Sequence, residues 1–318
     1  MGIALQKWPA GTQAMNQIYL DTARLMVQAA PMVFAGGMFA LKGGTAINLF
    51  IRDMPRLSVD LDLVFRDYTL PREQALNRIT TVLRESAERL EERRFQTRFV
   101  PAQDGTETKL LVRRHGIEIK IEVNFVLRGT LHPIRMASLT EKARETLLAD
   151  LELPVVSLED VYGGKLVAAL DRQHPRDLFD VMQLLAHEGI TEGIRRAFVV
   201  YLACHNRPVH EVLFPALHDI RQEYERTFQG MTAVPVALSA LIETREHLIH
   251  EIQERLDSDE RQFLLSLVQN KPEWGLLGFK HLEELPGIGW KVRNLTQLAK
   301  TNPKKFAAQA DELARLLS

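Results

Sequence analysis

The sequence has one cysteine, few aromatic residues and no excess of charge of either sign. Cys204 is the only cysteine among 318 residues, so no disulfide can form within the chain, which is typical of a reducing cytoplasm. We expect its side chain to be a small buried apolar group. Lysine and arginine number 40 and aspartate and glutamate 41, so any nucleic-acid-binding surface must be a local patch.

Long apolar runs and targeting signals are also missing. No apolar run approaches the roughly 18 residues that a membrane-spanning helix needs. Residues 1–17 contain no apolar stretch preceded by positive charge, so we expect no signal peptide. Hydrophobic residues make up 46% and charged residues 25%, which is typical of a soluble globular protein. We therefore expect a cytoplasmic protein without a membrane segment.

Apolar periodicity predicts a mixed first half and a helical second half. Helical spacing covers residues 13–30 and 71–94, and a short helix with Thr45 near its N-cap follows a glycine pair. Strands are predicted at 38–44, 56–65, 95–100, 108–115 and 117–127, with turns at Gln103-Asp104-Gly105 and His115-Gly116. We predict an α+β fold, with a small mixed sheet flanked by helices in residues 1–128 and an all-helical region in residues 129–318.

Two aspartates lie two residues apart in a run that otherwise resembles a buried strand. Side chains at i and i+2 on a strand share one face, so Asp60 and Asp62 project together, roughly 7 Å apart. Two carboxylates beside a core repel each other and are costly to bury. A divalent cation between them would remove that cost, and magnesium takes such oxygen ligands. A strand face exposed to solvent is the alternative.

Upstream of the aspartates, Lys42-Gly43-Gly44-Thr45 predicts a glycine corner between a strand and a helix. Glycines let a backbone approach a ligand closely, and the free N–H groups at a helix start attract phosphate. Lys42 adds a mobile positive charge and Thr45 a hydroxyl. A nucleoside triphosphate with its magnesium ion would bridge this corner and the aspartate pair.

A third carboxylate is expected on a neighbouring strand if two metal ions take part. Apolar and polar residues alternate along residues 117–127. Glu122 lies in the middle of the polar side, where it can face Asp60 and Asp62. A solvated polar face is the alternative interpretation.

Together these motifs resemble the DNA polymerase β-type nucleotidyltransferase superfamily, and within it the AbiEii family of toxin nucleotidyltransferases and its MenT-like relatives. The residues that carry the resemblance are Lys42-Gly43-Gly44-Thr45-Ala46, Asn48-Leu49-Phe50, Arg56-x-Ser58-x-Asp60-x-Asp62-Leu63, IKIEVN (119–124), LEDVYGGKLVAALDR (158–172) and PRDLFDV (175–181). Two features depart from the pattern. The spacing from Gly44 to Asp60 is long for the superfamily, although it suits this branch, and Glu122 stands where an aspartate is common.

The resemblance implies a toxin of a toxin–antitoxin or abortive-infection (phage-defence) system that transfers a nucleoside monophosphate from an NTP to an acceptor and releases pyrophosphate. In that reading residues 1–128 are the nucleotidyltransferase core. Mg²⁺ (or Mn²⁺) is held by Asp60, Asp62 and Glu122, and the NTP is bound by Lys42, Gly43, Gly44, Thr45, Arg56 and Ser58. Lys165, Asp177 and Asp180, from the helical region 129–318, complete the catalytic residues.

Several of these residues also have structural explanations. Arg56 can form a salt bridge with Asp53. Asp177 can be a charge at a helix start, and Asp180 can pair with Arg176 one turn away. The sequence does not decide which of the two aspartates is catalytic.

Adjacent glycines precede Lys165 inside a predicted helix. Each glycine costs up to about 1 kcal/mol relative to alanine there. Gly163 and Gly164 therefore predict close approach by the sheet or by a ligand, with Lys165 directed at the triphosphate. An exposed helix lysine is the alternative.

The MenT-like resemblance implies an RNA acceptor, the 3′ end of tRNA, and a cognate antitoxin as a partner. Patches that can bind RNA are Arg93, Arg94 and Arg98, and Arg113, Arg114 and His115, although solvated surface explains them as well. The segment LPGIG (285–289) resembles a DNA-binding helix-hairpin-helix turn, with packing of an apolar helix as the alternative. A small-molecule or protein hydroxyl acceptor, or a non-catalytic nucleotide- or nucleic-acid-binding protein, are the competing functions.

Overall fold

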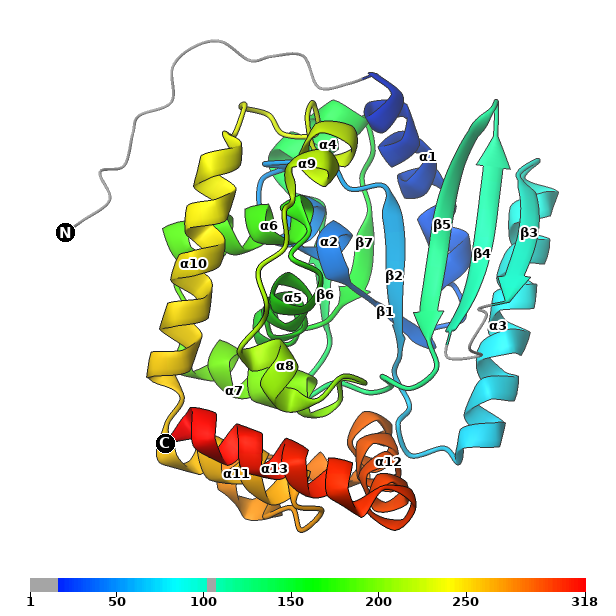
Figure 1. The fold of residues 1–318 in the computed structure, drawn as a ribbon. Coiled ribbons are helices and arrows are strands. Elements are labelled where there is room, and N and C mark those ends of the chain that lie inside the picture. Colours follow the sequence, from blue (N-terminus) through cyan, green and yellow to red (C-terminus); the bar gives the residue numbers. More distant parts are fainter. Residues whose placement is uncertain (1–16, 102–106) are drawn as a thin grey trace.

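A seven-stranded mixed sheet forms the centre of the computed structural model, which describes residues 17–101 and 107–318 (Figure 1). The strand order is β3-β4-β5-β2-β1-β7-β6. The strands are β1 (Phe39–Lys42), β2 (Asp60–Phe65), β3 (Gln96–Pro101), β4 (Glu107–Arg114), β5 (Ile117–Asn124), β6 (Arg135–Ser138) and β7 (Glu152–Val155). Strand β2 pairs antiparallel with β1 and parallel with β5, so the strand that carries the two aspartates is central in the sheet.

Helices cover both faces of this sheet. Figure 1 shows α1 (Gln17–Phe34) and α3 (Arg72–Glu92) behind the sheet, and α5 (Leu158–Arg172) and α6 (Pro175–Ala186) in front of it. The short α2 (Gly43–Thr45) continues as the π-helix η1 (Ala46–Ile51). The mixed sheet with flanking helices confirms the predicted α+β class. No helix in the described ranges is long and apolar enough to cross a membrane.

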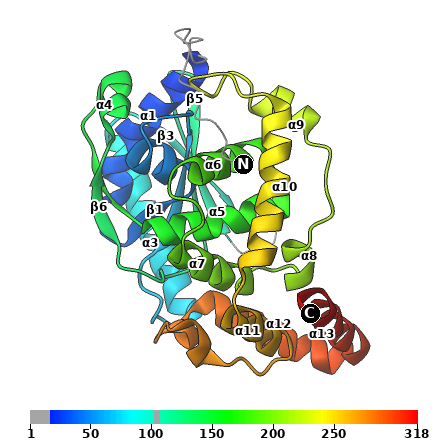
Figure 2. The same cartoon turned by 90° about the vertical axis from the view of Figure 1, so that its left-hand side faces the viewer.

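The remaining helices extend the front layer and close one end of the molecule. In Figures 1 and 2, α11, α12 and α13 lie together at the lower end, below the sheet. The elements are α4 (Glu141–Leu147), α7 (Glu192–Ala203), α8 (Val209–Leu213), α9 (Arg221–Thr227), α10 (Leu238–Arg255), α11 (Ser258–Val268), η2 (Trp274–Leu277), η3 (Leu282–Glu284), α12 (Pro286–Thr301) and α13 (Pro303–Leu317).

The sheet extends beyond the part of the chain in which strands were predicted. Strands β6 and β7 follow residue 128, and β7 joins β1 through the Leu41–Val155 pair. The prediction that residues 129–318 are all helical was therefore wrong for this stretch. Both strands have four residues, β6 is mostly exposed, and β7 contains Pro154, so neither shows the sustained apolar alternation that predicts a strand. The division into two domains at residue 128 stays a prediction.

Two local interpretations can be compared with the structure. The helix after the glycine corner begins at Gly43, and the Thr45 side chain makes no capping hydrogen bond, so the predicted cap was wrong. At LPGIG, Pro286 begins α12 and Gly287 and Ile288 are buried, which favours the alternative of apolar helix packing. The left-handed backbone of His115 and Gly116 confirms the turn between β4 and β5, whereas Gln103-Asp104-Gly105 lies outside the described residues.

Candidate active site

The glycine corner lies directly against the aspartate strand. Lys42, the last residue of β1, pairs with Asp62 of β2. Gly43 follows with φ of 72°, and a Cβ atom at this position would overlap the Asp62 carboxylate. A Cβ at Gly44 would lie 2.7 Å from a guanidinium nitrogen of Arg56. Both glycines are therefore required by neighbouring side chains of the protein, and the carboxylate of Asp62 is held beside the corner.

The two hydroxyls of the motif are buried and bonded within the protein. Thr45 Oγ1 donates a hydrogen bond to the carbonyl oxygen of Asp60 at 2.5 Å and lies 2.9 Å from Ser58 Oγ. The side chains of Thr45 and Ser58 are 1% and 7% exposed. These hydrogen bonds hold the start of β2 against the glycine corner. Contact between these hydroxyls and a phosphate stays a prediction.

The three predicted metal-binding carboxylates lie on adjacent central strands. Asp62 is paired with Glu122 of β5, and Asp60 with Lys120. Burial, followed by the negative charge of Asp62, raises the pKa of Asp60. Glu122 Oε1 lies 3.0 Å from Lys109 Nζ, which supplies a positive charge.

Two carboxylates, rather than three, are the donors that this arrangement offers a metal. Within residues 17–101 and 107–318, no three histidine, cysteine, aspartate or glutamate side chains are grouped as a ready metal site. Magnesium is commonly held by one or two carboxylates together with substrate phosphates and water. Burial and the negative charge of Asp62 raise the pKa of Asp60, so a cation beside it would stabilise the charged carboxylate. The donor set would therefore fit a magnesium ion whose remaining ligands are water and phosphate oxygens.

Behind the corner, a buried ion network joins β2 to the helices. Arg56 Nη2 lies 2.6 Å from Asp180 Oδ2, and Lys165 Nζ lies 2.9 Å from the same oxygen. Lys165 Nζ also donates to Asp177 Oδ1 at 2.8 Å, and Arg172 lies 2.8 Å from the other oxygen of Asp177. Among these, only Arg172 reaches solvent, with 61% of its side chain exposed.

The charges in this network stabilise one another against burial. Burial alone would raise the pKa of Asp180, but Arg56 and Lys165 hold that pKa below its usual value. The pKa of Asp177 is likewise lowered, because Lys165 and Arg172 outweigh burial. Burial alone would lower the pKa of Lys165, yet the two aspartates raise it. All four buried groups are therefore charged at neutral pH.

The structure corrects the pairings that were proposed as structural alternatives. Arg56 pairs with Asp180, whereas Asp53 Oδ1 accepts a hydrogen bond from the Lys142 backbone. Asp180 does not pair with Arg176, because its oxygens face Arg56 and Lys165. The exposed-lysine interpretation of Lys165 was wrong, since its side chain is 7% exposed. These partners are far apart in sequence, and short-range spacing could not identify them.

Asn48 belongs to the same network, and the sequence analysis gave it no role. Its Nδ2 donates to the Gly44 carbonyl at 2.9 Å and to Asp180 Oδ1 at 3.0 Å, and the side chain is fully buried. It thereby couples the glycine corner to α6. The signal available in the sequence was the position of Asn48 in the Asn48-Leu49-Phe50 motif. An amide buried there needs hydrogen-bond partners, because burying it without them would be costly.

A cavity of about 680 Å³ opens in front of the carboxylates. Of the predicted site residues, its walls contain Lys42, Gly43, Asp62, Glu122 and Lys165. The cavity also brings in residues that were not predicted as site residues. Asp160, Asp171 and Arg172 lie within the motif at 158–172, whereas Tyr201, His205 and Trp290 lie outside the motifs. The predicted residues that do not line it are Gly44, Thr45, Arg56, Ser58, Asp60, Asp177 and Asp180. The structure therefore separates the residues of the cavity wall from residues beside or behind it. Of the latter, Thr45, Arg56, Ser58, Asp177 and Asp180 are buried.

The glycine pair in α5 has two different environments. A Cβ at Gly163 would lie 2.8 Å from the Ala197 backbone, so helix α7 makes the close approach that had been expected from the sheet or a ligand. At Gly164, which lines the cavity, the nearest atom to a Cβ would be 3.9 Å away, on Tyr201.

The single cysteine is buried, as predicted. Cys204 is 7% exposed, and burial raises the pKa of its thiol to about 12.

Comparisons with known proteins agree with this geometry. The family profile for the nucleotidyl transferase AbiEii toxin of type IV toxin–antitoxin systems matches residues 24–293. No curated protein matches the sequence significantly. Among solved structures, the chain is similar to MenT4, a nucleotidyltransferase toxin from Mycobacterium tuberculosis H37Rv, with a TM-score of 0.59, 18% identity, and coverage of 87% of this chain and 93% of that one. The profile spans most of the chain, and the chain therefore belongs to the AbiEii family of nucleotidyltransferase toxins.

Proposed function

We propose that this nucleotidyltransferase transfers a nucleoside monophosphate from an NTP to RNA, at the 3′ end of tRNA, in a metal-dependent reaction. The observation that carries the proposal is the convergence of Lys42, Gly43, Asp62, Glu122 and Lys165 on one cavity. At about 680 Å³ it has the size of a nucleotide pocket, for which roughly 300–1,000 Å³ is usual. Carboxylates next to a glycine corner and positive charges are the groups that phosphoryl transfer requires.

The groups in the cavity wall, together with Asp60 beside it, each have a defined task in this proposal. Asp60 and Asp62, with Glu122 beside them, would hold magnesium, which supplies charge neutralisation on the phosphates when bound. The backbone of Gly43 approaches the triphosphate, and Lys42 faces Asp62 across the β1–β2 pair, where it offsets phosphate charge. Arg172, exposed at the cavity wall, offers a second positive charge.

The buried network acts as a support for this wall. Lys165 is tied to Asp177 and Asp180 within 2.9 Å, and it also lines the cavity. We assign Asp177 and Asp180 to positioning Lys165 and Arg56. A positioning role fits two aspartates that contact Lys165 but do not line the cavity.

The family membership also bears on the partners. A type IV toxin–antitoxin family implies a cognate antitoxin, which we propose is encoded beside this chain. MenT4 is described as a nucleotidyltransferase toxin, a description that names no acceptor. RNA and NTPs meet in the cytoplasm, which we propose as the place of action.

The proposal is tested by incubating the protein with each of the four radiolabelled NTPs, magnesium and total cell RNA. Label should appear in RNA of tRNA size, depend on magnesium, and disappear with Asp62→Asn. Asp150→Asn, which changes an exposed aspartate just before β7, is the matched control and should retain the label. Label in protein or in a small molecule would replace the RNA acceptor by another hydroxyl. No transfer of any label would contradict the proposed reaction.

A further inference from the structure

Three arginines from distant parts of the sequence meet beside the cavity. Arg72 lies in the first turn of α3, Arg128 in the loop after β5, and Arg293 in α12. Arg128 Nη1 lies 3.3 Å from the carbonyl oxygen of Leu70, two residues before Arg72. Burial, and then the positive charges of Arg72 and Arg293, lower the pKa of Arg128. We call these residues the arginine cluster.

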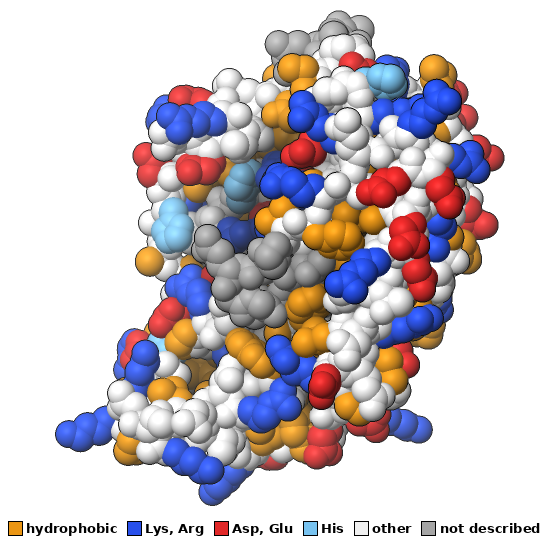
Figure 3. Space-filling view, turned by 90° about the vertical axis from the view of Figure 1, so that its right-hand side faces the viewer, with side chains coloured by type: hydrophobic (Ala, Val, Ile, Leu, Met, Phe, Trp, Pro, Cys, Tyr) orange, Lys and Arg blue, Asp and Glu red, His pale blue; other side chains and the backbone are white. Residues whose placement is uncertain are grey.

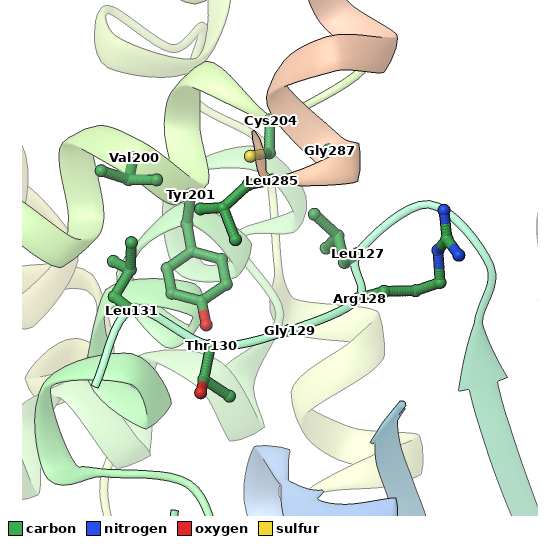
Figure 4. Close-up of a pocket in the computed structure, with 10 residues that line it drawn as sticks. All are labelled: Leu127, Arg128, Gly129, Thr130, Leu131, Val200, Tyr201, Cys204, Leu285 and Gly287. Atoms are coloured by element: carbon green, nitrogen blue, oxygen red, sulfur yellow. The ribbon is translucent and has the colours of Figure 1, made fainter. Parts of the chain in front are cut away.

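Arg128 is buried without satisfying its donors. Its side chain is 5% exposed, Nη1 makes a long hydrogen bond of 3.3 Å to the Leu70 carbonyl, and Nε has no partner. Figure 4 shows a small pocket next to Tyr201, and the Arg128 side chain extends away from that tyrosine. A buried guanidinium with an unused donor is costly unless an anion completes it.

The other two arginines are exposed and have no counter-charge of their own. Neither Arg72 nor Arg293 makes a hydrogen bond or ion pair with any residue in the described ranges. Asp67 contributes a negative charge near Arg128, but its Oδ1 already accepts two hydrogen bonds from Thr69. The cluster therefore retains a net positive charge.

The loop that carries Arg128 is held firmly in place. Gly129 donates to the Phe65 carbonyl at 2.8 Å, and a Cβ on this glycine would collide with the ring of Tyr68. His281 Nε2 lies 3.1 Å from the Thr130 carbonyl oxygen. These contacts fix the position of Arg128 between the start of α3 and the C-terminal helices.

The cluster is also adjacent to the catalytic cavity. Leu127 and Gly129, on either side of Arg128, line the cavity that contains Asp62 and Glu122. A Cβ at Gly287, in the first turn of α12, would lie 3.0 Å from Leu127, so α12 packs against the same loop. In Figure 3, lysine and arginine side chains are spread over this face of the molecule, including its lower part, where the C-terminal helices lie.

We propose that Arg72, Arg128 and Arg293 bind a backbone phosphate of the RNA acceptor and so direct its end into the cavity. The inference rests on the proposed function, because it assigns the acceptor rather than the NTP to this site. Arginine suits the role because its planar guanidinium can donate two parallel hydrogen bonds to one phosphate. The other source of the same chemistry is the triphosphate of the NTP, and the experiment separates the two.

The test is a salt titration of RNA binding by the full chain, without NTP or added metal. The probe is fluorescein-labelled total tRNA, followed by fluorescence anisotropy. The double variant Arg72→Gln/Arg293→Gln should bind about tenfold more weakly at low salt, and the slope of log affinity against log salt should become shallower by about 1–2. Both positions are exposed, so the fold should be retained, which a thermal melt checks.

A control with the same change in charge is available at the other end of the molecule. Arg144 of α4 and Arg221 of α9 are exposed, and Figure 1 places both helices at the top, opposite α12. Arg144→Gln/Arg221→Gln should bind tRNA with nearly the wild-type affinity and salt slope. A single Arg128→Lys variant, which keeps the charge but not the planar donor set, should weaken binding in the same direction as the cluster variant.

The outcomes distinguish this inference from the proposed function. Equal weakening by the cluster and control variants, or no tRNA binding by the wild-type protein, would overturn the inference. A titration with fluorescent NTP in which the cluster variant loses affinity while tRNA binding is unchanged would overturn it as well, because the site would then serve the triphosphate. Cluster-dependent tRNA binding without any labelling of RNA would support the inference and contradict the proposed reaction instead.

Discussion

The guanidinium of Arg56 lies 2.6 Å from the carboxylate of Asp180, a residue 124 positions later in the chain, and both side chains are buried. The pair joins the segment that leads into the aspartate strand to helix α6. A buried ion pair of this kind adds little net stability relative to apolar residues, but it is costly to break. It fixes how the helical layer sits behind the cavity.

Removing one partner of this pair should destabilise the protein strongly. Asp180→Asn leaves Arg56 with one neutral partner and deprives Lys165 of a counter-charge, so we expect the free energy of unfolding to fall by about 3–5 kcal/mol. Urea denaturation followed by circular dichroism measures the change. Asp53 is exposed and does not pair with Arg56. Asp53→Asn should therefore lower the free energy of unfolding by less than about 1 kcal/mol. Equal effects of the two substitutions would show that the buried pair is not critical.

The adjacent glycines of α5 should respond in opposite ways to alanine. Gly163→Ala places a Cβ 2.8 Å from the Ala197 backbone and should destabilise by about 1–3 kcal/mol through overpacking against α7. Gly164→Ala meets no atom closer than 3.9 Å and should be neutral or stabilising by up to about 1 kcal/mol, since alanine favours the helix. Thermal melts of the two variants measure this. Equal stability of the two variants would contradict the close packing of α5 on α7 at Gly163.

His174 should make stability depend on pH in the acidic range. Its Nδ1 accepts a hydrogen bond from the Arg176 backbone at the start of α6, and burial, followed by the charge of Arg176, lowers its pKa to about 4. Neutral His174 contributes its full share to the free energy of unfolding above about pH 6.5, because only below that pH does the unfolded chain take up the proton. This contribution is lost as the pH falls from about 6.5 to 4, by on the order of 2 kcal/mol.

The His174 prediction is checked by comparing unfolding free energies at pH 7 and pH 4.5. In His174→Asn the amide oxygen can still cap the helix, so stability at pH 7 should change little and the acid-dependent loss should be smaller. The same pH dependence in the variant and the wild-type protein would assign the loss to other groups.

The carboxylates of the central strands should differ in their effect on activity. Asp62→Asn should lower kcat at least about a hundredfold, because it removes a charge that positions the metal-bound phosphates. Glu122→Gln, on the neighbouring strand, should lower kcat less if magnesium is held mainly by the aspartates. Glu118→Gln, an exposed residue of the same strand, should have the wild-type rate. Initial rates of label transfer to RNA give the comparison, and an unchanged rate in Asp62→Asn would exclude it from the reaction.

The motifs identified part of the cavity wall but not the ion pairs behind it. The apolar residues of β2 and β5, among them Leu61, Leu63 and Ile121, lie in the core, and the register places Glu122 beside Asp62. The short strands β6 and β7 were missed, because four-residue segments carry too little pattern.

The central strand, the glycine corner and the family can be read from the sequence, because each depends on local spacing and on residue types that few other arrangements require. Which opposite charges pair follows from the three-dimensional fold alone: Arg56 with Asp180, and Lys165 with both helical aspartates. The physical reason is that ion pairs form through space between side chains whose separation along the chain carries no periodic signal. Burial then makes those pairings decisive, because a charge removed from water must find its partner within the fold.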